Sequence, residues 1–163
     1  MNDIPASDNS GRNVVFLVAR SIHLVRDGRE VAHSLSRVEW WNEHVLWCDG
    51  HSPAQMEQAG EDRLRICARN WACEMKELHA GLSGISQERV LEVRYEQLIA
   101  SPVEQLGTIL RFPGLSVSAD YQDAIESLQL AYWPGAWSVG WTPEQLECVV
   151  HEEQSLLSEY GYV

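Results

Sequence analysis

The order strand, helix, strand over residues 22–93 is the feature that most constrains the fold. Residues 22–25 and 90–93 are short apolar runs with the length of buried strands, and helical patterns lie between them. Strands that alternate with helices form parallel sheets, because a parallel connection needs a crossover of a dozen or more residues. We therefore predict an α/β fold with a small parallel sheet flanked by helices.

Apolar spacing and capping residues predict the other helices. The last helix begins at Pro143, where Thr142 and Gln145 form a capping box. Two segments rich in aromatic residues are expected to be loops, at residues 40–60 and 132–141. Four further helices are expected, at residues 29–40, 61–79, 102–110 and 121–130.

The N-terminal part of the chain is predicted from composition. Residues 1–12 are polar and rich in turn formers, which predicts a loose tail ahead of one domain at residues 13–163. The apolar run at residues 14–19 predicts a strand. Only two residues separate it from the strand at 22–25, so the two runs form either one long strand or a hairpin.

Composition and charge exclude several classes of protein. The chain has 163 residues, of which 45% are hydrophobic, so one folded domain is expected and disorder throughout is not. The formal net charge of −12 would repel a phosphate backbone, so nucleic-acid binding is not expected. No apolar run reaches the roughly 18 residues of a membrane span, and the N-terminus lacks a signal-peptide pattern. We therefore expect a cytoplasmic protein without a membrane span.

The cysteines do not form a C-x-x-C pair, and a cytosolic protein is expected to keep them reduced. Cys67 and Cys73 lie inside an apolar helical pattern, which favours a packing role. His44, Cys48 and His51 form the one group with the spacing of metal ligands. A fourth ligand is not evident, so a solvated loop is favoured over a zinc site and no metal is expected.

The candidate binding residues lie where the strand at 22–25 ends and a helix begins. Ligands of open α/β sheets bind beyond the carboxyl ends of the strands, and free N–H groups at a helix start favour an anion. Arg26 offers a planar fork of donors there, and Ser34 follows about two helical turns later. The alternative is a structural Arg26–Asp27 ion pair with Ser34 as a plain surface hydroxyl. Residue types alone leave both interpretations open.

Three segments together resemble one family. Residues 26–34, Arg-Asp-Gly-Arg-Glu-Val-Ala-His-Ser, resemble the 3′-phosphate-binding segment of sulfotransferases that use 3′-phosphoadenosine 5′-phosphosulfate. Residues 90–98, which end in Tyr-Glu-Gln-Leu, resemble the family's later strand and the turn after it. The Trp-containing stretch, the Thr-Pro-Glu helix start and the Tyr-Gly-Tyr ending over residues 137–162 resemble its C-terminal part. The resemblance covers about residues 21–162.

The resemblance implies a truncated P-loop-like three-layer fold and transfer of a sulfuryl group to a hydroxyl or amine. The donor would be 3′-phosphoadenosine 5′-phosphosulfate, the acceptor a small molecule or a glycan, and no metal would be needed. Arg26 and Ser34 would hold the 3′-phosphate of the nucleotide, and Tyr95 would lie near it. Three tryptophans would lie toward the acceptor or would only seal a core: Trp40, Trp41 and Trp47.

The sequence also departs from the family pattern. The family's Gly-rich, Lys-containing loop for the 5′-phosphosulfate has no counterpart, because the only lysine, Lys76, lies within a predicted helix. The family commonly has an Arg or Lys just before the Trp-containing loop, but residues 133–137, Trp-Pro-Gly-Ala-Trp, include no basic residue. No catalytic base can be assigned. We therefore interpret the chain as a C-terminal portion of a sulfotransferase domain that does not turn over alone. The alternatives are a nucleotide-binding protein without catalysis and a structural α/β domain without a ligand.

Overall fold

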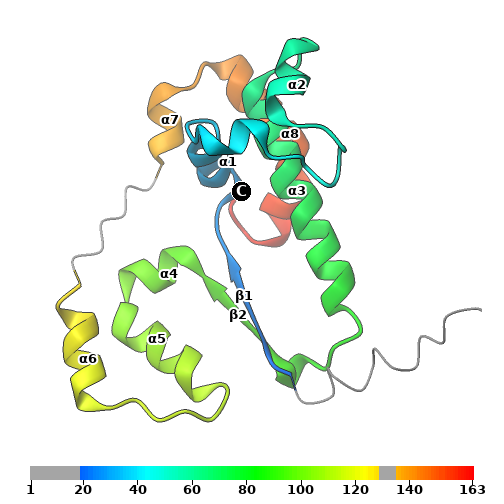
Figure 1. Cartoon of the computed structure of the whole chain (residues 1–163). Helices are drawn as coiled ribbons and strands as arrows, with labels where there is room; N and C mark the ends of the chain where they lie inside the picture. Colours follow the sequence, from blue (N-terminus) through cyan, green and yellow to red (C-terminus); the bar gives the residue numbers. More distant parts are fainter. Residues whose placement is uncertain (1–18, 129–134) are drawn as a thin grey trace, which may run out of the picture.

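The computed structural model describes residues 19–128 and 135–163 (Figure 1). Two strands, β1 (Ser21–Val25) and β2 (Val90–Arg94), form its sheet. They run parallel, with Ser21 opposite Val90 and Val25 opposite Arg94. The predicted α/β fold with a small parallel sheet is therefore confirmed, and the carboxyl ends of both strands lie at one edge.

Helices flank this sheet on both sides (Figure 1). The long helix α3 and the last helix α8 pack against each other and against the sheet, whereas α4, α5 and α6 form a group on the other side. No helix of the described residues is long and apolar enough to cross a membrane. In chain order the helical elements are α1 (Gly28–Leu35), the 3₁₀ turn η2 (Trp40–Glu43), α2 (Pro53–Gln58), α3 (Arg63–Leu82), the 3₁₀ turn η3 (Gln87–Arg89), α4 (Tyr95–Ala100), α5 (Pro102–Arg111), α6 (Ala119–Glu126), α7 (Ala136–Gly140) and α8 (Pro143–Glu159).

The core lies where α1, α3 and α8 meet the sheet. The apolar residues of α3 recur at helical spacing, so they share one face, and this face is buried. Trp71 on that face is only 5% exposed and packs with Val25 and Leu157, so it is a core residue. Burying a large aromatic side chain stabilises the fold by about 2 kcal/mol or more. The core therefore fixes α3 and α8 against the end of β1.

Capping residues explain where several helices begin. The predicted box at α8 is present: the Thr142 hydroxyl accepts from Gln145 N, and the Gln145 side chain accepts from Thr142 N. Ser52 and Gln55 form a second capping box at α2. The prediction of an irregular loop over residues 40–60 is therefore wrong at residues 53–58, which form α2. The sequence did contain a signal for this helix, because residues 52–55, Ser-Pro-Ala-Gln, repeat the capping-box pattern of residues 142–145, Thr-Pro-Glu-Gln.

Three other predicted boundaries differ from the structure. The helix predicted at 29–40 ends at Leu35, because the Ser36 hydroxyl donates to the backbone carbonyl of His33 in the last turn. Helix α6 begins earlier than the predicted residue 121, because Ser118 caps its first turn, and it ends at Glu126. Helix α7 occupies part of the loop predicted at 132–141. The tail at 1–12 and most of the strand at 14–19 fall outside the described residues.

The prediction that all cysteines are reduced is wrong. Cys48 and Cys73 form a disulfide that ties the segment after η2 to α3. A bonded Cys48 thiol is not available to the metal-like group with His44 and His51. The pair escaped sequence analysis because spacing alone does not reveal which cysteines meet in space. Disulfides are rare in the reducing cytosol, so the cytoplasmic location stays a prediction.

Cys67 matches its predicted packing role. It is fully buried on α3, and burial raises the pKa of its thiol to about 12. A thiol with this pKa stays protonated and inert at neutral pH, and it behaves as a small apolar side chain.

Candidate anion-binding site

The candidate site lies at the carboxyl edge of the sheet, where β1 continues into α1. Asp27 caps α1 by accepting from Arg29 N, and its carboxylate also accepts from the Arg29 side chain, with Nε–Oδ1 at 2.9 Å and Nη2–Oδ2 at 2.7 Å. The partner of Asp27 is therefore Arg29, and the alternative of an Arg26–Asp27 ion pair is wrong. Because Arg29 neutralises the capping carboxylate, Arg26 is left for other partners.

Arg26 and Tyr95 come together at this edge. The guanidinium carbon of Arg26 lies 4.6 Å from the centre of the Tyr95 ring, a cation–π contact between the ends of β1 and β2. The Nη2 atom of Arg26 lies 3.5 Å from Glu30 Oε2, which is long for a charge-assisted hydrogen bond. The Nε of Arg26 is buried and has no hydrogen-bond partner among the described residues. The guanidinium is thus held in a fixed plane with an unused donor.

Ser34 lies on the same helix as Glu30. Among the described residues, no hydrogen bond or other contact joins Ser34 to Arg26. Its position is four residues after Glu30, which places the two on one side of α1. The side chain of Ser34 is exposed. Eight residues separate it from Arg26, which corresponds to about 12 Å along a helix axis. A shared role of Arg26 and Ser34 in holding one phosphate therefore stays a prediction.

Glu30 is a residue of this site that sequence analysis missed. It is 3% exposed, and its Oε1 accepts a 2.6 Å hydrogen bond from Gly135 N, just before α7. Gly135 has a φ of +74°, a left-handed conformation that glycine adopts without strain. Glu30 thus holds the start of α7 against α1 while it also faces Arg26. Its spacing of four residues from Arg26 was the available signal.

The end of the chain closes the other side of the site. The Tyr162 hydroxyl donates to Glu96 Oε2 at 3.0 Å, and Glu96 Oε1 accepts from Asp27 N at 3.0 Å. The carbonyl of Tyr162 also accepts from Arg29 Nη2. Burial, with Glu96 close by, raises the pKa of the Tyr162 phenol, so the hydroxyl is a donor at neutral pH. These contacts join β1, α4 and the C-terminus into one rigid rim.

An aromatic wall stands over the first turns of α1. The guanidinium carbon of Arg29 lies 4.7 Å from the centre of a Trp137 ring, and Trp137 contacts Trp141 at a centroid separation of 5.7 Å. Trp141 in turn contacts the ring of His33 at 5.9 Å. Burial lowers the pKa of His33, so this imidazole is neutral at pH 7. The wall offers flat apolar surface beside the two arginines of the site.

The three tryptophans proposed near the acceptor have different positions. Trp41 is 3% exposed and belongs to the core, where the guanidinium of Arg63 lies over its ring. Trp40 and Trp47 are 73% and 58% exposed. Trp41 therefore seals the core, and only the other two present aromatic surface to a ligand or partner.

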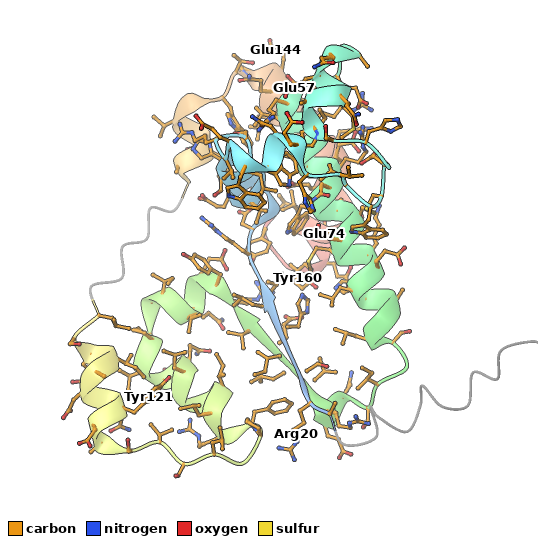
Figure 2. The ribbon with its side chains drawn as sticks, viewed as in Figure 1. Arg20, Glu57, Glu74, Tyr121, Glu144 and Tyr160 are labelled. Carbon is orange, nitrogen blue, oxygen red and sulfur yellow. A yellow bond between two sulfur atoms is a disulfide. The ribbon has the colours of Figure 1, made fainter. Side chains whose placement is uncertain are left out.

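Lys76 lies on the exposed side of α3, two residues after Glu74, which is labelled in Figure 2. The partners of Arg26 among the described residues are Glu30 and Tyr95, and Lys76 does not take part in the site.

Comparison with known proteins identifies the class. A sequence model described as "Sulfotransferase family" matches residues 15–119. The chain therefore belongs to the sulfotransferase family. The match covers β1, α1, β2 and α4, the elements that carry or adjoin Arg26, Glu30 and Tyr95.

The fold agrees with this assignment. The structure titled "Sulfotransferase Domain from the Curacin Biosynthetic Pathway" is similar, with a TM-score of 0.52 and 16% sequence identity. The match covers 85% of this chain and 55% of that structure, so the chain spans about half the length of the domain it resembles. At this identity the likeness concerns the fold. No curated protein matches the sequence.

Proposed function

We propose that this chain binds the nucleotide end of 3′-phosphoadenosine 5′-phosphosulfate as part of a sulfotransferase. The reaction of such an enzyme moves the sulfuryl group to a hydroxyl or amine of a small-molecule or glycan acceptor. Family membership supports the class of reaction, and the edge of the sheet supports the position of the nucleotide. The roles of Arg26, Ser34 and Tyr95 are part of this proposal.

The observation that carries the proposal is the buried, unpartnered Nε of Arg26. A buried donor without an acceptor is costly, and the cost is removed if a ligand supplies an oxygen. A phosphate accepts from Nε and one Nη of the same guanidinium, in the planar geometry that Arg offers. The Tyr95 ring packs against the face of the guanidinium, so little side-chain freedom of Arg26 is lost on binding. These residues fit the 3′-phosphate of the nucleotide.

The 5′-phosphosulfate end has no comparable set of cations among the described residues. The only lysine of the chain lies on the exposed side of α3. Transfer of a charged group relies on cations aimed at the transferring oxygens. We therefore assign binding of the nucleotide to this chain and expect little or no sulfuryl transfer by the purified chain alone. When bound, the nucleotide supplies the sulfuryl group, and Arg26 and Ser34 orient its 3′-phosphate.

Calorimetric titration with adenosine 3′,5′-bisphosphate tests the proposal. A charge-assisted hydrogen bond contributes about 1.5–3 kcal/mol, so Arg26→Ala should weaken binding roughly ten- to a hundredfold. Arg26→Lys should restore only part of the affinity, because a point charge does not replace the fork. Arg111→Ala is the matched control, since Arg111 is exposed on α5. Equal affinity of wild type and Arg26→Ala would place the phosphate elsewhere.

The second candidate is a structural α/β domain without a ligand, and the pairing of Arg26 with buried Glu30 favours it. In that case Arg26 serves only to neutralise Glu30. Glu30→Gln separates the two functions: it frees Arg26 for a phosphate and should strengthen nucleotide binding. A wild-type chain that does not bind the nucleotide, together with a Glu30→Gln variant that also does not, would support the structural candidate.

A further inference from the structure

A cavity lies away from Arg26, toward the amino end of β2. It has a volume of about 560 Å³ and is bounded by the last turns of α3, the turn after it and the first half of β2. This volume is in the usual range for small-molecule sites. Arg20, labelled in Figure 2, marks the same end of the sheet, because it directly precedes β1. The cavity and the candidate nucleotide site therefore lie toward opposite ends of the two strands.

The wall of this cavity combines an apolar surface with acceptors. Leu82, Ile85 and Val90 provide the apolar part. His79 and Glu92 provide polar atoms, and neither Lys nor Arg is among the described residues that line the cavity. Glu92 is 47% exposed at its side chain, so its carboxylate is accessible at the mouth of the cavity. The lining thus combines the Glu92 carboxylate with an apolar surface formed by Leu82, Ile85 and Val90.

His79 is held in a fixed orientation. A hydrogen bond joins its Nε2 to the hydroxyl of Tyr160, which Figure 2 labels between the strands and α3. Its Nδ1 lies 3.7 Å from Glu159 Oε1, a second carboxylate near this wall. Burial raises the pKa of the Tyr160 phenol, so Tyr160 stays neutral and its hydroxyl can donate.

His23 lies next to His79 and Glu92 of the cavity lining, and one of its ring nitrogens lacks a hydrogen-bond partner among the described residues. Its ring centre lies 6.1 Å from that of His79, and its Nδ1 lies 3.9 Å from Glu92 Oε2. Its Nε2 is buried and has no partner among the described residues. Burial lowers the pKa of His23, so the imidazole is neutral at pH 7 and does not cancel the charge of Glu92.

We propose that this cavity binds a small organic ammonium ion with an apolar body. The ammonium group would lie at Glu92, where it gains a carboxylate partner, and the body would cover Leu82, Ile85 and Val90. A neutral ligand would gain only the apolar contact, and an anion would be repelled by Glu92 and by the acidic chain as a whole. None of the residues that line this cavity belongs to the candidate nucleotide site.

The test is titration of the full chain with 2-phenylethylammonium, in which binding is measured by nuclear magnetic resonance chemical-shift changes and by calorimetry. A fragment of this size should bind with a Kd of about 1 mM. The uncharged isostere 2-phenylethanol should bind about five- to tenfold more weakly, which is the contribution of one partly exposed ion pair. Shifts should be confined to the end of α3 and the start of β2, and adenosine 3′,5′-bisphosphate should not displace the ammonium.

Two variants of matched chemistry complete the test. Glu92→Gln keeps the size of the side chain and should weaken ammonium binding about five- to tenfold. Glu88→Gln, in the exposed turn η3 beside the cavity, should leave it unchanged. Circular dichroism establishes that both variants are folded. Absence of ammonium binding, equal affinity for the alcohol, or unchanged affinity in Glu92→Gln would each overturn the proposal.

Discussion

Glu153 makes the stability of this protein depend on pH in an unusual direction. It lies on α8 with no exposed surface, and neither carboxyl oxygen has a hydrogen-bond partner among the described residues. Burial, with a smaller contribution from Asp27, raises the pKa of its carboxyl to about 9, although Arg29 opposes the shift. Glu153 is therefore a neutral carboxylic acid in the folded chain at pH 7, whereas the unfolded chain ionises it.

The sign of the effect follows from proton binding. Because the folded pKa exceeds the unfolded value of 4.5, the folded state holds a proton that the unfolded state has released over most of the window from pH 4.5 to about 9. The contribution is fully present below pH 4.5 and is lost as the pH rises toward 9. Each pH unit within the window costs about 1.4 kcal/mol. From pH 7 to 8.5 the free energy of unfolding should therefore fall by about 2 kcal/mol.

This pH interval separates Glu153 from other titrating groups. Buried His23 and half-buried His33 have lowered pKa values, so their effect on stability is nearly complete by pH 7, and what remains would raise the stability with pH, opposite to Glu153. Cys67 has a raised pKa, and its contribution begins to change only near pH 9. Between pH 7 and 8.5 the slope therefore belongs to Glu153.

Urea unfolding followed by tryptophan fluorescence at pH 7.0, 7.5, 8.0 and 8.5 measures the slope. Glu153→Gln keeps the shape of the side chain and removes the ionisable proton, so its stability should be almost constant over this interval. Glu147→Gln, an exposed position on the same helix, should keep the wild-type slope. A flat wild-type curve, or a slope that survives in Glu153→Gln, would refute the reasoning.

Two further changes test the packing around the site and the link to α3. Gly28→Ala should destabilise the fold by about 1–3 kcal/mol in urea unfolding, because the added Cβ would meet the Glu153 carboxyl and the Trp71 ring at 2.5–2.6 Å, whereas Gly84→Ala meets nothing and should be neutral or stabilising. Cys48→Ser should cost about 3 kcal/mol by removing a disulfide between residues 25 apart, and dithiothreitol should lower the stability of the wild type, but not of Cys48→Ser, by a similar amount.

Local rules were sufficient to predict much of the fold from the sequence. The parallel pairing of residues 22–25 with 90–93 followed from the helical pattern between them, because a connection of that length permits a parallel return. The start of α8 at Pro143 followed from its capping box. The capping box depends on neighbours close in the sequence, and the pairing was inferred from strand and helix patterns that are each local. The disulfide depends on the fold that brings residue 48 to the middle of α3, and spacing does not encode that approach.

The site shows the same division between local and distant information. The contact between Arg26 and Tyr95 was foreseeable, because each follows one of two strands that were expected to end at a common edge. The carboxylates around them come from elsewhere: Glu153 reaches Gly28 from α8, and Glu30 turns inward to Gly135. A glutamate in an amphipathic helix is expected to face water. Only the tertiary structure shows that Glu153 and Glu30 are buried close to Arg29 and Arg26, and that Glu30 lies where it would compete with an incoming phosphate for Arg26.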